Sequence, residues 1–188
     1  PEKAIGYRNW PMRYDRGILF VNNKFTVIRD STNWIVGATA RMGANWTFGE
    51  LGSAGTNWVN VWLPKLVFAY GVYLRPISSA PKDLLIWFAP RPDATLQIEK
   101  LNSVRKEIAT YHYPTNSYLN LPLRAWYTRT GDWPAGSKQG FTTVLMPHDP
   151  RVPAEPLAQA LRTLRDDEGC CAVQITGSDT TYLAVMNN

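Results

Sequence analysis

The stretch RGILFVNNKFTVIRD, residues 16–30, decides the fold because two runs of β-branched and aromatic residues flank a pair of turn-forming asparagines. This pattern predicts a β-hairpin that turns at Asn22 and Asn23. Side chains in a strand alternate between two faces, so the hairpin is expected to have one apolar face. That face is predicted to carry Ile18, Phe20, Phe25 and Val27. Because an isolated hairpin is marginally stable in water, the rest of the chain must supply further strands.

Short apolar runs separated by Gly, Pro and Asn clusters recur along most of the chain, and each of them predicts a strand. The predicted strands lie at 34–40, 58–63, 66–74, 84–89, 94–100, 103–113, 123–129, 140–146, 171–175 and 181–186. The run LLIWFA at 84–89 is apolar throughout, which is typical of a strand buried on both faces. Segment 103–113 also fits a short helix, but its strand neighbours and β-favouring end, TYHY, favour a strand.

One segment near the C-terminus has helical spacing instead. Pro156 suits the first turn of a helix, and Gly169 supplies a stop. Between them the apolar residues recur at helical intervals: Leu157, Ala160, Leu161 and Leu164. The sequence therefore predicts an all-β fold, an antiparallel β-sandwich of two large packed sheets with one short α-helix near the C-terminus. A single domain is expected over residues 1–188.

Length and composition exclude some classes of protein. The 188 residues, 45% of them hydrophobic, are enough for a sizeable core, so disorder is not expected. No run approaches the roughly 18–20 uncharged apolar residues that a membrane helix needs. Cys170 and Cys171 are adjacent, and a disulfide at that spacing would be strained. We expect them to be small apolar residues at the start of a strand.

The net charge of +5 lies in the first half of the chain. Residues 1–94 hold 11 Lys and Arg against 6 Asp and Glu, whereas residues 95–188 hold nine of each. Basic residues interleaved with aromatic ones suit an acidic ligand, either an acidic polysaccharide or a nucleic acid. The candidate ligand-binding residues are Arg16, Arg29, Arg41 and Trp46. Scattered charges on solvated strand faces would give the same count, and Asp15 and Asp30 would then neutralise the first two arginines.

Segment 41–64 has an unusual composition, with four glycines and three tryptophans at low charge. Its glycine-rich middle, 49–55, predicts a long loop, and such loops are often functional. Aromatic rings beside small residues can stack on sugars. The alternative is that the tryptophans belong to the core. We expect this for Trp58 and Trp62, and both alternatives stay open for Trp46.

The hairpin sequence resembles the hairpin that opens the C-terminal β-sandwich of heparinase II/III-like polysaccharide lyases. A second stretch, FTTVLMP at 141–147, is similar to the late strand of the same domains. The resemblance implies that the chain belongs to a longer multidomain polypeptide and follows an N-terminal helical domain. It further implies an acidic polysaccharide as the partner, with neither a membrane nor a nucleic acid expected, and a secreted or periplasmic location.

In such lyases most of the catalytic groups come from the helical domain, so the isolated chain is expected to be inactive. A lyase that acts on uronic acids needs a base to abstract a proton and an acid to protonate the leaving oxygen, commonly Tyr and His. His112 and Tyr113 are the candidates, and a capped strand end is the alternative. His148 is expected in a solvated turn. With two histidines and no ligand spacing, no metal or cofactor is expected. A non-catalytic carbohydrate-binding or structural module remains the alternative function.

Overall fold

A computed structural model describes residues 12–21, 24–48, 50–62, 66–68, 74–76, 82–100 and 123–187. The first strands are β1 (Met12–Val21), β2 (Phe25–Trp34), β3 (Ala38–Phe48), β4 (Glu50–Ala54), β5 (Trp58–Trp62), β6 (Leu66–Phe68) and β7 (Leu74–Pro76). The next are β8 (Asp83–Phe88), β9 (Thr95–Lys100), β10 (Leu123–Trp133) and β11 (Lys138–His148). The last elements are helix α2 (Ala154–Gln159), β12 (Leu161–Asp166), β13 (Cys170–Thr176) and β14 (Thr181–Asn187).

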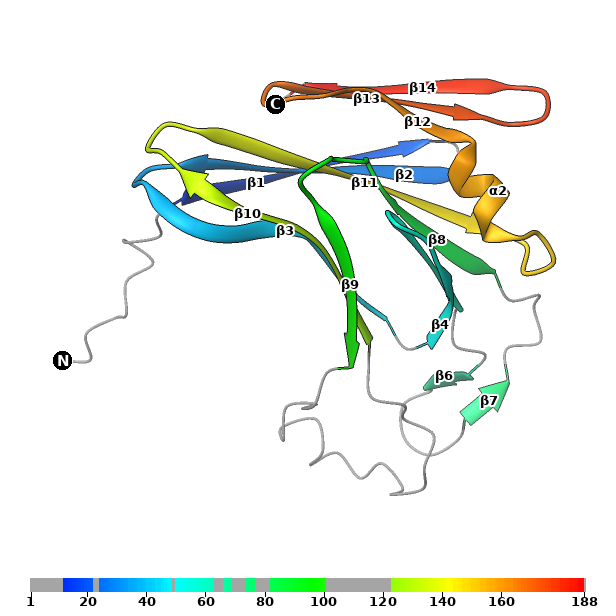
Figure 1. Ribbon diagram of the computed structural model, residues 1–188. Coiled ribbons are helices and arrows are strands. Elements are labelled where there is room, and N and C mark those ends of the chain that lie inside the picture. The colour runs from blue at the N-terminus through cyan, green and yellow to red at the C-terminus, as the bar shows by residue number, and fades with distance from the viewer. Residues whose placement is uncertain are drawn as a thin grey trace.

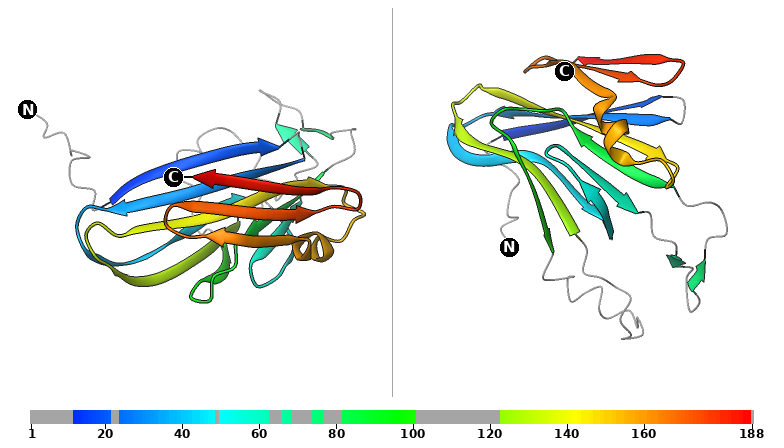
Figure 2. Two further views of the ribbon diagram at one scale, coloured as in Figure 1. Left: turned by 90° about the horizontal axis from the view of Figure 1, so that it is seen from above. Right: turned by 45° about the vertical axis from the view of Figure 1, so that its right-hand side comes forward.

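Apart from β6 and β7, which pair with each other, these strands form antiparallel sheets in three layers (Figure 1). The middle layer is a six-stranded sheet in the order β1-β2-β11-β8-β5-β4. One face of it is covered by α2 and the sheet β12-β13-β14, and the other face by the curved sheet β3-β10-β9. Figure 2 shows the same stacking from two further directions. The predicted antiparallel β-sandwich with a short helix near the C-terminus is therefore confirmed, and the structure adds a third layer.

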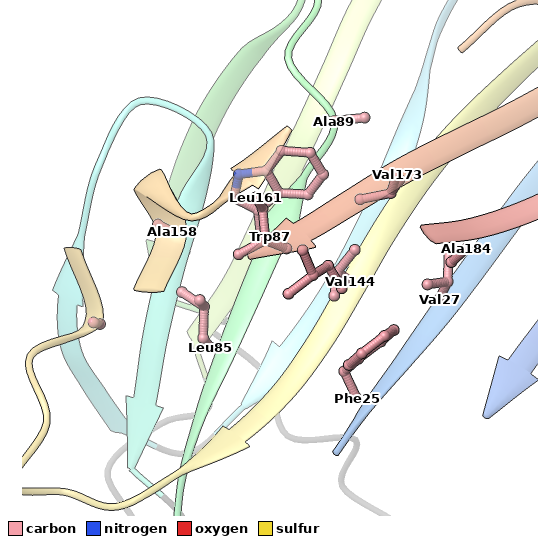
Figure 3. Packing of buried hydrophobic residues seen from close by; sticks show 12 residues of the cluster. Phe25, Val27, Leu85, Trp87, Ala89, Val144, Ala158, Leu161, Val173 and Ala184 are labelled. Atoms are coloured by element: carbon pink, nitrogen blue, oxygen red, sulfur yellow. The ribbon is translucent and has the colours of Figure 1, made fainter. Parts of the chain in front are cut away.

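Strand β8 lies at the centre and packs against both outer layers. Leu85 and Trp87 belong to the first core cluster, which the six-stranded sheet shares with α2, β12, β13 and β14 (Figure 3). Ile86 and Phe88 belong to the second cluster, beneath β3-β10-β9. All four side chains are at most 2% exposed. The prediction that this run is buried on both faces is confirmed.

The hairpin of β1 and β2 is also confirmed, but its predicted apolar face is correct only on β2, where Phe25 and Val27 are buried, and is wrong on β1. Val21 pairs with Phe25 and Leu19 with Val27, so three residues rather than two separate the strands. The odd-numbered residues of both strands therefore share the face that packs on the first cluster. Ile18 is consequently 51% exposed and Phe20 76% exposed. A change of one residue in the turn moves every side chain of β1 to the opposite face relative to β2.

Three other local predictions are wrong because tertiary pairing overrides the local pattern. The helix ends at Gln159, since Leu161 pairs with Ile175 of β13 and is buried in the first cluster. The predicted loop at 49–55 is largely strand, because β4 pairs with β5. The chain also turns at 35–37, within a predicted strand, so that β3 begins only at Ala38.

The cysteines lie where they were expected. Cys170 and Cys171 begin β13, and both are buried free thiols. Burial raises the pKa of the Cys171 thiol.

Candidate functional site

Arg29 lies inside the protein, where a ligand cannot contact it. Only 1% of the residue is exposed, and its guanidinium is paired with Asp166 of β12. Its Nη1 also donates a hydrogen bond to the hydroxyl of Thr142 at 2.9 Å. Arg29 therefore joins the six-stranded sheet to the β12-β13-β14 sheet. The prediction that Arg29 binds a ligand is therefore corrected: Arg29 is a buried structural residue.

Arg16 points to the opposite face from Arg29 because it pairs in register with Asp30. The two side chains form a bidentate ion pair, with Nε to Oδ1 at 2.6 Å and Nη2 to Oδ2 at 3.0 Å. Asp30 thus neutralises Arg16, as one of the two alternatives predicted, but it does not pair with Arg29. The arrangement leaves Arg16 little capacity for an external anion.

Tyr14 and Trp46 complete this corner of the molecule. Tyr14 donates a hydrogen bond to Asp30 at 2.5 Å. Burial, helped by the carboxylate that accepts this bond, raises the pKa of Tyr14 to about 12. Trp46 is half-buried against the second core cluster, and the Arg16 guanidinium lies 5.8 Å from its ring centroid. Trp46 therefore packs against the core and also contacts the guanidinium group of Arg16.

Arg41 has a different environment, on the outer face of the β3-β10-β9 sheet. It is exposed, and it donates to Thr128 Oγ1 from Nε at 2.7 Å and to Gln97 Oε1 from Nη2 at 2.6 Å. Its guanidinium carbon lies 5.3 Å from the ring centroid of Trp126. The guanidinium carbon of Arg124 lies 5.0 Å from the same centroid. We call Arg41, Arg124 and Trp126 the Arg–Trp face.

Sequence reasoning missed Arg124 and Trp126, although a signal was present. In LRAWYTR, residues 123–129, alternation separates Arg124 and Trp126 from Ala125 and Tyr127. Ala125 and Tyr127 are buried in the second core cluster, so the other two side chains point outward. The segment lies in the half of the chain that has no net charge, so the charge distribution does not point to it.

Acidic side chains near the Arg–Trp face reduce its charge only in part. Glu99 accepts a hydrogen bond from the Trp126 indole nitrogen at 2.6 Å and lies 3.9 Å from Nη1 of Arg124. Asp93 is paired with Arg129, and Asp132 accepts a hydrogen bond from Thr39. The face thus combines two guanidinium groups with one neighbouring carboxylate.

A second candidate site is a groove of about 800 Å³ between the β4–β5 hairpin and the segment that leads into α2. Asn57, Trp58, Asp83 and Glu155 contribute to its lining. Trp58 also packs partly against the first core cluster, in agreement with the expectation that it contributes to the core. This groove is acidic rather than basic, so it does not suit a polyanion.

His148 lies beneath this groove and not in a solvated turn, so that prediction is wrong. The residue is 7% exposed, and its Nε2 lies 2.8 Å from Oδ1 of Asn60. Asn60 in turn donates to Asp83 at 3.1 Å. Adjacent strands β5, β8 and β11 contribute these three side chains, and all three are buried. A hydrogen-bonded polar chain is therefore built into the end of the six-stranded sheet.

Replacing His148 by Ala is expected to lower the free energy of unfolding by about 1–3 kcal/mol, because Asn60 would keep a buried amide oxygen with no partner. Urea unfolding measures the effect. Replacing the exposed Asp179 by Ala is the control, and it should change stability by less than about 0.5 kcal/mol. Equal stability of the two variants would show that the polar chain contributes nothing.

The catalytic candidates His112 and Tyr113 lie outside the described residues. Among the side chains that are described, no group of three or more His, Cys, Asp or Glu could hold a metal ion. Within the same ranges, no helix is both long enough and apolar enough to cross a membrane.

Comparison with solved structures connects this fold to known proteins. The heparan sulfate lyase HepC from Pedobacter heparinus matches 94% of this chain with a TM-score of 0.59 and 16% sequence identity. A protein described as heparinase III matches 95% of the chain with a TM-score of 0.52 and 10% identity. The chain has the fold of one segment of these lyases. This confirms the structural resemblance inferred from the hairpin sequence.

The likeness is one of fold alone, because the sequences have diverged widely. The chain spans about a quarter of the length of these lyases, 24% in each case. No protein-family model matches the sequence. No curated protein matches it either.

Proposed function

We propose that this chain is the β-sandwich part of a heparinase II/III-like polysaccharide lyase and that it supports a cleft for an acidic polysaccharide. The observation that carries the proposal is the match of 94% of the chain to one segment of a heparan sulfate lyase. The exposed Arg41 and the partly exposed Arg124 of the Arg–Trp face support an acidic ligand, because guanidinium groups bind sulfate and carboxylate groups well.

On this proposal the chain is one domain, residues 1–188, of a longer secreted or periplasmic polypeptide. An N-terminal helical domain of that polypeptide supplies most of the catalytic groups. His112 and Tyr113 remain the candidates for any catalytic contribution from the sandwich itself. The isolated chain binds the polysaccharide and does not cleave it.

A non-catalytic carbohydrate-binding module is the second candidate function. The observation that favours it is the basic and aromatic Arg–Trp face itself, which can bind an acidic polysaccharide without any catalytic group. The two functions differ in whether cleavage ever occurs in the polypeptide that carries this domain.

The test is an assay of the 188-residue chain for the unsaturated product of a lyase, beside a binding assay on the same polysaccharides. We expect binding to heparan sulfate without product. Turnover by the isolated chain would contradict the claim that the chemistry needs another domain. If the longer polypeptide binds heparan sulfate and also leaves it intact, the binding-module function is the correct one.

A further inference from the structure

The outer face of the β3-β10-β9 sheet presents two guanidinium groups on either side of one indole ring. We propose that the Arg–Trp face is a binding subsite for a polymer that carries repeated sulfate or carboxylate groups. The inference rests on the proposed function, for which it names the ligand-binding residues and the class of ligand. It transfers ligand binding from Arg16 and Arg29 to Arg124, retains Arg41, and assigns to Trp126 the ordering of both guanidinium groups.

The positions along β10 explain how the ring is flanked. Arg124 precedes Trp126 by two residues, so the two side chains share one face of the strand. Arg41 reaches across from β3 and donates to the hydroxyl of Thr128, two residues after Trp126. The guanidinium groups therefore lie on opposite sides of the ring along the strand. At 5.0 Å and 5.3 Å from the ring centroid, both are within cation–π range.

These contacts prepare the arginines for an anion before it arrives. The hydrogen bonds to Thr128 and Gln97 and the stacking on Trp126 restrict the Arg41 side chain. A side chain that is already ordered loses less conformational entropy on binding. Arg41 uses Nε and Nη2 in these bonds, and Arg124 donates no hydrogen bond to any described residue. Both guanidinium groups thus retain donors for sulfate or carboxylate oxygens.

The placement of the two arginines suits a chain of anions. Arg124 precedes Trp126 on β10, and Arg41 bonds to Thr128 beyond it, so the two guanidinium groups follow one another along the strand. Anionic groups that repeat along linked sugar rings can contact both in turn. The polar neighbours Asn45 and Thr47 extend the same exposed face along β3.

The same geometry favours a polysaccharide over a single-stranded nucleic acid. Single strands are held chiefly by bases that stack on aromatic rings. Here both guanidinium groups already lie over the Trp126 ring, so the ring orders the arginines and offers less free surface to a base. Contacts with the ligand are left to the charged groups.

Glu99 is the opposing charge on this face, and it provides a test with an expected gain. Its carboxylate lies 3.9 Å from Arg124 and accepts the indole hydrogen bond. Glu99→Gln keeps an oxygen that can accept from Trp126 but removes the negative charge. We expect this variant to bind an anionic polymer about two- to threefold more tightly, because a repulsion is lost.

The main experiment measures binding of the 188-residue chain by calorimetry to four probes: heparin, hyaluronan, which carries carboxylates only, neutral dextran and single-stranded DNA. The double variant Arg41→Gln, Arg124→Gln is expected to lose about tenfold or more of the heparin affinity, because charged hydrogen bonds are removed. The matched control is Arg162→Gln, Arg165→Gln, which removes two exposed arginines from β12 in a different layer. The control should retain its affinity within about twofold, since distant exposed charges are screened.

A conservative variant keeps the test informative if the double Gln variant is unstable. Arg41→Lys, Arg124→Lys retains the charge but loses the planar fork and its stacking on Trp126. We expect an affinity between those of the wild-type chain and the Gln variant. Thermal unfolding of each variant shows whether the fold is intact. A comparison of heparin with hyaluronan distinguishes sulfate from carboxylate as the preferred group, and dextran should not bind.

Several outcomes would overturn the inference. One is an equal loss of heparin affinity in the Gln variant and in the β12 control. Another is that the wild-type chain binds neither heparin nor hyaluronan. The third is that the wild-type chain binds single-stranded DNA as tightly as heparin. Binding that survives in the Gln variant would leave the proposed function intact and remove only this subsite. Conversely, loss of binding in the Gln variant, together with turnover by the isolated chain, would support the subsite and contradict the proposed division of labour with a helical domain.

Discussion

Replacing Asp166 by Ala is expected to lower the free energy of unfolding by about 3–5 kcal/mol, because it removes the partner of a buried charge. The Asp166 side chain is 6% exposed and pairs with Arg29 and with Arg91, the latter at 3.0 Å. It also accepts a hydrogen bond from Thr142 at 2.9 Å. These contacts join β12 to the six-stranded sheet.

The guanidinium group of arginine stays protonated in proteins, so Arg29 cannot relieve the loss by giving up its proton. In the Asp166→Ala variant, Arg29 would stay charged at 1% exposure and would keep only hydrogen bonds to Thr142 and to the carbonyl of Asp167. The Arg29→Ala variant should be less costly, since Asp166 would still have Arg91. The order of the two variants therefore tests which charge depends on the other.

Urea unfolding of both variants measures these effects, with Asp179→Ala as the exposed control. A third variant removes both charges together, Arg29→Met with Asp166→Leu. It should recover much of the stability, because apolar replacement of a whole buried pair is often neutral. An Asp166→Ala variant within about 1 kcal/mol of the control would show that water enters and hydrates Arg29.

The ion pair also shows where sequence reasoning ends. The hairpin, the strand buried on both faces and the closing hairpin of β13 and β14 follow from local patterns, and each is present. The partner of Arg29, however, stands 137 residues later in the chain. No local pattern contains that pairing. The sequence therefore offers Arg29 as a candidate for ligand binding, whereas its partner is Asp166, in the β12-β13-β14 layer.

The candidate site was predictable in part. The charge distribution of the sequence predicts Arg41 as a ligand-binding residue. The alternation in LRAWYTR, residues 123–129, places Arg124 and Trp126 on one face of a strand. Their meeting depends on the pairing of β10 with both β3 and β9, which the sequence does not specify. The same limit applies to Leu161. Its spacing predicts a helix, but it lies in β12 and pairs with Ile175 of β13. The local pattern thus predicts which side chains share a face of one strand, whereas the pairing of strands decides which side chains of other strands lie beside them.

Gly43 gives the second large expected effect, because β3 and β10 approach closely at this residue. Gly43 pairs in register with Thr128. A Cβ added to Gly43 would lie well inside van der Waals contact of the Tyr127 carbonyl oxygen and 2.6 Å from the Thr128 Cα. Both atoms belong to backbone, so no side-chain rotation relieves the clash. We expect Gly43→Ala to lower the free energy of unfolding by roughly 3 kcal/mol or more.

The same substitution should also weaken binding to heparin, although it changes no charge. Arg41 lies two residues before Gly43 and donates to Thr128, so a shift of β3 away from β10 would separate Arg41 from Trp126. Thermal unfolding and heparin affinity measure the two effects. The control is Gly169→Ala, whose added Cβ would meet only the Asp167 carboxylate, at 3.9 Å. If the Gly43→Ala variant is destabilised but keeps its heparin affinity, binding does not depend on the register of β3 and β10. The stacked arrangement of the Arg–Trp face would then not be needed for binding.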